Sequence, residues 1–99
     1  MKLACQEQLI PGDTIEAKWE LVHRLGFDAI ELLGRSKMAL AGRLPELKAA
    51  QAKGAVFSSV CVAMPNFVGD ADEEARRDAI ANVKSQLTVI AELGGVGVV

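Results

Sequence analysis

The chain has 99 residues, of which 51% are hydrophobic and 24% are charged, and its formal net charge is −2. This length allows a single domain over residues 1–99, and the composition is typical of a globular fold rather than of a disordered segment. The weak acidity offers no basic face to nucleic acid or to an anionic membrane, and no apolar run approaches the roughly 18 residues of a membrane span. Because the chain turns polar too early for a signal peptide and its two cysteines fit no metal or redox spacing, we expect a cytoplasmic protein.

The first predicted element is a strand over residues 3–8. Side chains alternate between the two faces of a strand, so Leu3 and Cys5 share one face. Gln6 and Gln8 then fall together on the other face, where they form the polar side of this strand.

A helix is predicted to follow the Pro-Gly turn at residues 11–12. Asp13, three positions before Glu16, is expected to cap it. Apolar residues recur at helical spacing and predict its buried stripe, which consists of Ile15, Trp19, Val22 and Leu25. His23, the only histidine, falls outside this stripe. It could serve as a metal ligand, but its placement favours a solvated helix residue.

The second strand is predicted over residues 29–33 and carries an acidic side chain. Ile30 and Leu32 share one face of this strand, and Glu31 points to the other. A carboxylate that faces inward costs several kcal/mol unless it is paired or solvated. Glu31 is therefore expected near an open end of the sheet or in a site.

The loop at residues 34–37, which contains Arg35, is basic and polar. It is either an anion-binding loop or an ordinary solvated loop. Residues 38–42 stay ambiguous between an extended loop and a helical turn. Pro45 suits the first turn of a second helix. The inward face of that helix is predicted to consist of Leu44, Leu47, Ala50 and Gln51.

The third strand is predicted over residues 55–64, and its nearly continuous apolar run indicates a parallel strand covered on both faces. The long loop 65–71, which contains Asn66, precedes a third helix that Asp72 is expected to cap. The buried stripe of this helix is predicted to consist of Ala79, Ile80, Val83, Leu87, Ile90 and Ala91. Two glycines end the helix, and residues 96–99 start a fourth strand.

A helix, a glycine and a strand follow one another three times, at Gly26, Gly54 and Gly94. The order of elements is therefore β-α-β-α-β-α-β, which predicts an α/β fold with parallel strands and outer helices. Two folds begin this way, the open doubly wound sheet and the closed (β/α)8 barrel. The glycines at 94, 95 and 97 do not form a dinucleotide loop, because they precede a strand instead of following one.

Several segments resemble a known family when they are taken in order. Residues 11–18, Pro-Gly-Asp-Thr-Ile-Glu-Ala-Lys, and residues 25–32, Leu-Gly-Phe-Asp-Ala-Ile-Glu-Leu, resemble the opening of the sugar phosphate isomerases/epimerases. Asp72, Arg76-Arg77 and residues 90–95 are similar to the third helix of that family and the approach to its fourth strand. The family belongs to the xylose isomerase-like TIM barrels, together with the endonuclease IV-type enzymes (AP endonuclease family 2). The resemblance covers essentially the whole chain.

The resemblance implies a partial TIM barrel, a (βα)3β half-barrel that forms the N-terminal half of the fold. Family members are about two to three times as long. They interconvert sugars or hydroxy-carbonyl compounds by proton transfer next to a carbonyl, with a divalent metal held by residues of later strands. Any metal ligands are therefore expected from the missing second half. The third strand here ends in Ala-Met-Pro-Asn without a histidine, which counts against the endonuclease branch.

The positions that match the first half of the family are Glu31 in the second strand and the ends of the first and third strands. In an enzyme whose site is shared across a dimer, Glu31 of each copy is predicted to act as a base or metal ligand, and Gln6, Gln8 and Asn66 are predicted to orient substrate hydroxyls. Arg35, from the basic loop, completes the predicted substrate-binding set. The alternative for Glu31 is a barrel-lining carboxylate satisfied by hydrogen bonds from neighbouring strands. For the amides it is ordinary solvated polarity at strand ends.

The first and fourth strands would be unpaired edges of an open sheet. Because such edges invite pairing with another chain, we expect a homodimer or larger assembly. Three functions stay open at this point: an inactive half of an isomerase barrel, a non-catalytic module that binds a small anion or a partner, and an enzyme whose site is shared across a dimer.

Overall fold

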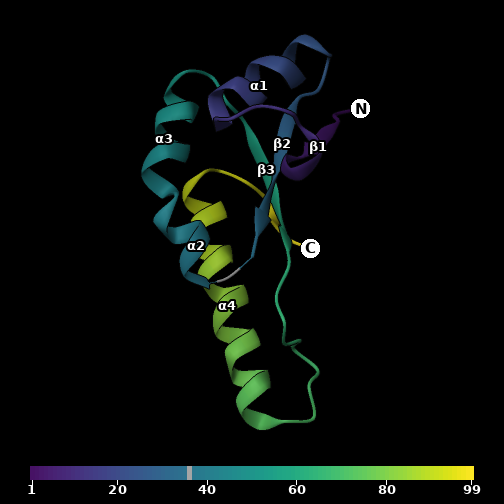
Figure 1. Ribbon diagram of the computed structural model, residues 1–99, viewed down its shortest axis with the longest axis vertical. Coiled ribbons are helices and arrows are strands. Elements are labelled where there is room, and N and C mark those ends of the chain that lie inside the picture. The colour runs from purple at the N-terminus through teal and green to yellow at the C-terminus, as the bar shows by residue number, and fades with distance from the viewer. Residues whose placement is uncertain (36) are drawn as a thin grey trace.

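The computed structural model describes residues 1–35 and 37–99, with side chains described throughout these ranges except at 37–39. Among these residues, four parallel strands form one sheet in the order β1-β2-β3-β4, with the helices gathered to one side of it (Figure 1). In chain order the elements are β1 (Ala4–Gln6), the 3-10 turn η1 (Glu7–Leu9), α1 (Ile15–Arg24), β2 (Ala29–Gly34), α2 (Lys37–Gly42), α3 (Leu44–Ala52), β3 (Phe57–Val62), α4 (Glu73–Glu92) and β4 (Gly97–Val98).

The α/β class and the parallel sheet predicted from the sequence are confirmed. The strands lie side by side in their chain order, whereas a doubly wound sheet reverses its order at a switch point. The sheet is open on both edges within the described chain, and a partial TIM barrel is not confirmed by this arrangement. None of the described helices is long and apolar enough to cross a lipid bilayer.

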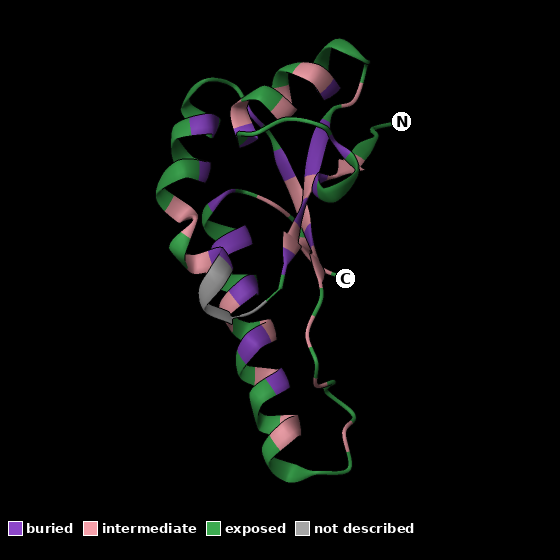
Figure 2. Cartoon of the chain, viewed as in Figure 1, coloured by how far each residue is buried: buried purple, intermediate pink, exposed green. Residues whose placement is uncertain are grey.

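The hydrophobic core lies between one face of the sheet and the helices (Figure 2). Ile30 and Leu32 of β2 and Val60 of β3 are completely buried there against Leu47 of α3 and Ile90 of α4. Side chains on the opposite face of β2 and β3, such as Glu31, Ser59 and Cys61, are only half-buried. The prediction of a third strand covered on both faces is therefore wrong, because the helices cover only one.

The ends of the first helix differ from the prediction. The N-cap is Thr14, whose side-chain oxygen accepts a hydrogen bond from the Ala17 N–H at 3.1 Å, and not Asp13. Leu25, predicted to be buried, lies just past the helix and is 65% exposed. The prediction for α4 is confirmed, because Asp72 caps it by accepting from the Ala75 N–H at 2.8 Å.

Glycine ends three of the helices as predicted. Gly26, Gly54 and Gly94 have φ angles of 94°, 105° and 78°, a region that side chains with a Cβ rarely adopt. The ambiguous residues 38–42 belong to α2. In α3, Leu47 is buried as predicted, whereas Gln51 is exposed and donates its side-chain N–H to the Leu93 carbonyl at 2.7 Å.

The buried face of α4 agrees only in part with the predicted stripe. Ala79 and Ile90 are buried as predicted, but Leu87 is 41% exposed, and Asn82 and Gln86 are buried instead. The Gln86 Nε2 donates to Asn82 Oδ1 at 2.8 Å, so the two amides partly satisfy one another. Gln86 fits because it packs directly over Gly34, which has no side chain. A glycine at the end of β2 thus creates the space that a buried glutamine fills.

This packing makes Gly34 sensitive to substitution. A Cβ at position 34 would lie 1.9 Å from Gln86 Oε1 and 2.7 Å from Val60 Cγ1, and both neighbours are fully buried. We predict that Gly34→Ala lowers the free energy of unfolding by about 2–3 kcal/mol, as measured by urea denaturation.

Gly42→Ala is the matched control for this variant. A Cβ at position 42 meets nothing within 4 Å, and an alanine inside a helix is favoured over glycine by about 1 kcal/mol. We therefore expect this control to be neutral or slightly stabilising. Equal destabilisation by both variants would contradict the packing argument.

Candidate functional site

A row of hydrogen-bonded polar side chains crosses the open face of the sheet. Gln6 of β1 pairs in register with Glu31 of β2, which in turn pairs with Ser59 of β3. The Gln6 Nε2 donates to Glu31 Oε1 at 2.9 Å, and the Ser59 hydroxyl donates to Glu31 Oε2 at 2.6 Å. Gln8 extends the row, because its Nε2 donates to Gln6 Oε1 at 2.8 Å. We call Gln8, Gln6, Glu31 and Ser59 the polar row.

A register shift brings Ser59 beside Glu31. Ile30 pairs with Phe57, but the next residue, Glu31, pairs with Ser59, so that β3 contains one extra residue at Ser58. Such bulges redirect the side chains that follow them and are common beside active sites. Without this extra residue, Ser58 and not Ser59 would oppose Glu31.

Glu31 is held firmly and still reaches the open face. Each of its carboxylate oxygens accepts one hydrogen bond from a neutral donor, and the residue is half-buried. These bonds remove most of the cost of placing a carboxylate on the sheet. They also fix its direction, which is the property that a proton-transfer group requires.

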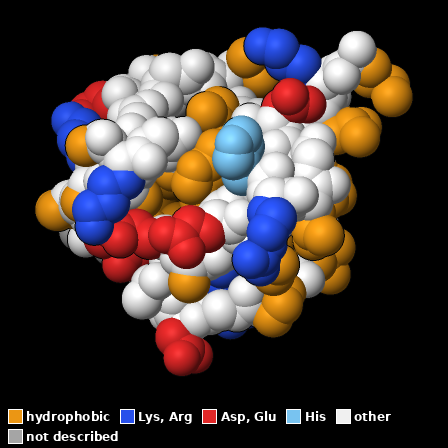
Figure 3. Space-filling model, turned by 90° about the horizontal axis from the view of Figure 1, so that it is seen from above, with side chains coloured by type: hydrophobic (Ala, Val, Ile, Leu, Met, Phe, Trp, Pro, Cys, Tyr) orange, Lys and Arg blue, Asp and Glu red, His pale blue; other side chains and the backbone are white. Residues whose placement is uncertain are grey.

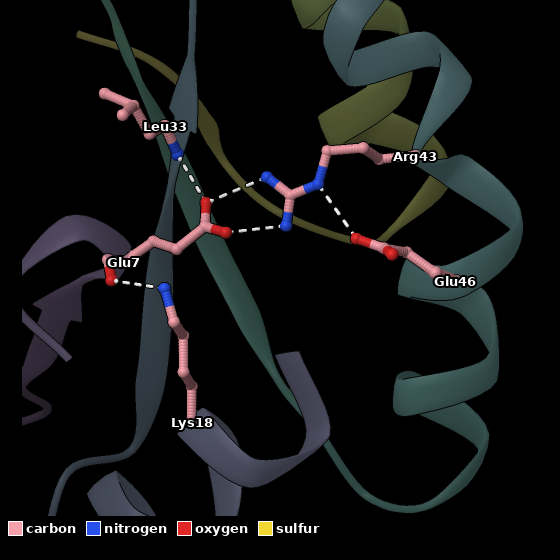
Figure 4. A network of polar contacts seen from close by, with 5 residues as sticks. All are labelled: Glu7, Lys18, Leu33, Arg43 and Glu46. Carbon is pink, nitrogen blue, oxygen red and sulfur yellow. Dashed lines mark hydrogen bonds and ion pairs between the residues drawn. The ribbon is translucent and has the colours of Figure 1, made fainter. Parts of the chain in front are cut away.

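A second carboxylate, Glu7, is buried beside the row, on the helix side of the molecule (Figure 4). The guanidinium of Arg43 donates two hydrogen bonds to the Glu7 carboxylate, one of 3.1 Å to Oε2 and one of 2.6 Å to Oε1. The Leu33 N–H of β2 donates to Glu7 Oε2 at 3.0 Å, and the Lys18 ammonium of α1 donates to the Glu7 carbonyl at 3.1 Å. Glu7 thus joins the end of β1 to β2, to α1 and to the residue between α2 and α3.

The charges of this network are mutually stabilised. Burial alone would raise the pKa of Glu7, but the hydrogen bonds from Arg43 and the Leu33 N–H, with the charges of Arg43 and Lys18, outweigh burial and lower it. The hydrogen bond to Glu7 raises the pKa of Arg43 in turn, with a further contribution from Glu46. Glu7 and Arg43 are therefore an ionised pair at neutral pH.

The structure brings together some of the predicted site residues. Gln6, Gln8 and Glu31 form the polar row, and Gln8 also lines a pocket of about 290 Å³ together with Arg35. Asn66 does not join them, because its side-chain N–H donates to Asp78 of α4 at 3.3 Å in a separate depression. Within the predicted loop 34–37, Ser36 lies outside the described residues, as does the side chain of Lys37.

The described residues do not form a metal centre. No three histidine, cysteine or acidic side chains among them are grouped so that they could hold an ion. Glu31 is bonded to one amide and one hydroxyl, and a divalent cation needs more anionic or imidazole ligands than this row supplies. We therefore derive no step through a metal.

His23 is a surface residue. It stacks on Trp19 with ring centroids 5.0 Å apart and an angle of 20° between the planes. Figure 3 looks onto this end of the molecule, where the imidazole is exposed among basic and acidic side chains. The solvated placement that the sequence favoured is the one observed.

Sequence reasoning missed Glu7, Arg43 and Ser59. One signal for Glu7 was available: continuing the alternation of the first strand puts it on the core-facing side with Leu3 and Cys5, where a carboxylate requires a cation. The sequence gives no comparable signal for Arg43, which is 36 residues away. Ser59 could not be assigned to Glu31 without knowledge of the register shift.

The chain is similar to sugar epimerases of known activity. It is 30% identical to the 3-dehydro-D-guloside 4-epimerase of Escherichia coli over 100 aligned positions, which cover 100% of this chain and 37% of that protein. The crystal structure of the apo form of 3-keto-D-glucoside 4-epimerase, YcjR, from E. coli matches the fold with a TM-score of 0.85 at 30% identity, over 99% of this chain and 36% of that chain. The chain thus spans little more than a third of the relatives it matches. No family model matches the chain.

These comparisons correct the assignment made from the sequence. The expectation of a sugar epimerase-like protein holds in its coarser form. The finer assignment, to the N-terminal half of a xylose isomerase-like sugar phosphate isomerase, is wrong. The matching proteins are named as epimerases that act at carbon 4 of a keto sugar glycoside, and the chain covers little more than a third of their length instead of half. The alternative of a non-catalytic half-barrel is rejected on the same findings.

The Glu7 network predicts a specific response to acid. A glutamate with an ordinary pKa of 4.5 when unfolded and a lower pKa when folded stabilises the protein fully above that value. As the pH falls towards the folded pKa, the unfolded state binds more protons and this stability is lost. We predict that Glu7→Gln lowers the free energy of unfolding by about 3 kcal/mol at neutral pH, because Arg43 loses its buried partner. We also predict a flatter pH dependence below about pH 5 in urea titrations.

Glu46→Gln is the matched control, because Glu46 binds the same guanidinium at 2.9 Å from an exposed position. An exposed pair contributes at most about 1 kcal/mol. A loss as large as that of Glu7→Gln would show that the buried network has no special role.

Proposed function

We propose that this chain takes part in the 4-epimerisation of a keto sugar glycoside and that Glu31 transfers a proton in that reaction. The observation that carries the proposal is the polar row, in which a half-exposed carboxylate is fixed by donors from both neighbouring strands. The similarity along the whole chain to a curated sequence and a solved structure that are both named as 4-epimerases supports it.

The chemistry explains why a fixed carboxylate is useful. In a 3-keto sugar the C4–H bond lies next to a carbonyl, so its electrons can pass to the C3 oxygen when a base removes the proton. The planar enediolate that results is reprotonated at C4 from the opposite face, which inverts that carbon without net oxidation or reduction. Glu31 is assigned one of these two proton transfers, as the base that accepts the C4 proton or, in reverse, returns it.

The neighbours of Glu31 have supporting roles in this proposal. Gln6 and Ser59 each donate to one carboxylate oxygen and hold the group in place. Gln8 is exposed at the end of the row, and its amide is available to hydrogen-bond a sugar hydroxyl. Asn66 is given no role, because it is bound to α4 away from the row.

Proton exchange at C4 tests the proposal directly. A 3-keto glucoside is incubated with the protein in D2O, and loss of the C4 proton signal is followed by proton NMR against a protein-free blank. We predict that Glu31→Gln slows this exchange by about 10²–10⁴-fold, because an amide cannot accept the proton.

Glu20→Gln serves as the matched control, since Glu20 is an exposed glutamate of α1 outside the polar row. We expect it to leave exchange unchanged. Absence of exchange with the unmodified protein, or equal rates for Glu31→Gln and the control, would refute the proposed role.

A further inference from the structure

A cationic pocket lies next to the polar row, at the carboxyl ends of β1 and β2. It has a volume of about 290 Å³ and is lined, among the described residues, by Glu7, Gln8, Lys18, Leu33, Arg35 and Arg43. Gln8 belongs both to this pocket and to the polar row, so the two are contiguous. Ligands of parallel α/β sheets bind at this end of the strands.

The three cationic side chains of the pocket differ in the partners that they bind. Arg43 is held by the carboxylates of Glu7 and Glu46. The Lys18 ammonium donates to a backbone carbonyl of Glu7, which satisfies one of its donors without cancelling its charge. Arg35 is exposed and, within the part of the chain that the structure describes, has no acidic partner. The pocket walls therefore carry three cationic side chains and one carboxylate, and the guanidinium of Arg35 is bound to no carboxylate among the described residues.

We propose that this pocket binds a carboxylate on the aglycone of the glycoside, with Arg35 as the residue that determines this specificity. This inference rests on the proposed function, because it names the substrate class for the same site: keto glycosides whose aglycone is an acid. A guanidinium presents two parallel donors that match a carboxylate. Glu7 and Arg43 neutralise one another, so Lys18 and Arg35 give the pocket the positive charge that an anionic group of the ligand offsets.

The size of the pocket agrees with this assignment. A volume of about 290 Å³ lies just below the usual range for small-molecule sites, so it suits one substituent rather than a whole sugar chain. The sugar itself would lie over Glu31, with Gln8 between the two groups. The aglycone is also the part of a glycoside that the names of the related epimerases leave open.

Three ligands measured by calorimetry test the inference without depending on catalysis. They are 4-carboxyphenyl glucoside, phenyl glucoside and benzoate, each titrated into the protein and into the Arg35→Gln variant. We predict that the carboxylated glucoside binds about tenfold more tightly than the neutral one and that Arg35→Gln abolishes this difference. The preference should also weaken as salt is added, because exposed charges are screened.

Arg24→Gln is the matched control, since Arg24 is an exposed arginine of α1 that does not line the pocket. It removes the same charge and should preserve the preference. Equal affinity for the two glucosides, or equal loss of the preference in both variants, would overturn the inference and leave the role of Glu31 untouched.

Failure of the proposed function gives a different result. If benzoate binds in an Arg35-dependent way while neither glucoside binds more tightly than benzoate, the carboxylate pocket stands and the assignment to a glycoside falls. If Glu31→Gln stops proton exchange while Arg35→Gln leaves the charge preference intact, epimerisation stands and the pocket assignment falls.

Discussion

The ion pair between Glu7 and Arg43 is the contact on which the arrangement of the site depends. β1 is only three residues long, and the chain leaves it through a tight turn that begins at Glu7. A strand this short has few ladder hydrogen bonds, so its end requires another anchor. Glu7 provides one by binding the backbone of β2 and the side chain of Arg43 at the same time. Because Gln6 and Gln8 flank Glu7 in sequence, anchoring Glu7 also places both amides over the open face.

The ion pair also divides the charged residues into two groups. Removing charges from water costs several kcal/mol per ion, and only a partner with good geometry offsets that cost. Arg43 and Glu7 satisfy this condition for each other and are consequently unavailable for a ligand. Glu31 is held by neutral donors, and Arg35 has no acidic partner among the described residues, so neither side chain is part of an ion pair there. The charged residues that hold the fold together thus lie near the charged residues that we propose for function, and the two groups differ in the partners that they bind.

The sequence predicted burial well on β2 and less well on the helices, where Leu25 and Leu87 were expected to be buried and are exposed. Ile30 and Leu32 are completely buried as the strand alternation required, and the helix–glycine–strand joins are found at the expected places. Prediction failed where burial depends on a partner far along the chain. Gln86 is buried because Gly34 leaves space for it, and no hydrophobic pattern contains that information. The same contrast holds in the candidate site. Glu31 could be predicted from the alternation of its own strand, whereas the contact of Ser59 with Glu31 depends on the register shift between β2 and β3, which the sequence does not reveal. Self-association through the sheet edges stays a prediction.

The open face of the sheet suits the proton-transfer role that we propose for Glu31. Glu7 is a buried carboxylate that accepts hydrogen bonds from two guanidinium N–H groups and one backbone N–H, and these contacts lower its pKa and occupy most of its lone pairs. Among the described residues, each oxygen of Glu31 accepts one hydrogen bond, which leaves lone pairs free towards the face of the sheet that the helices do not cover. Inversion at a carbon next to a carbonyl needs a proton acceptor on one face of the sugar and a donor on the other. A carboxylate on the uncovered face of a sheet can reach one face of a sugar that lies over it. The other face of the sugar then stays accessible to a second proton-transfer group.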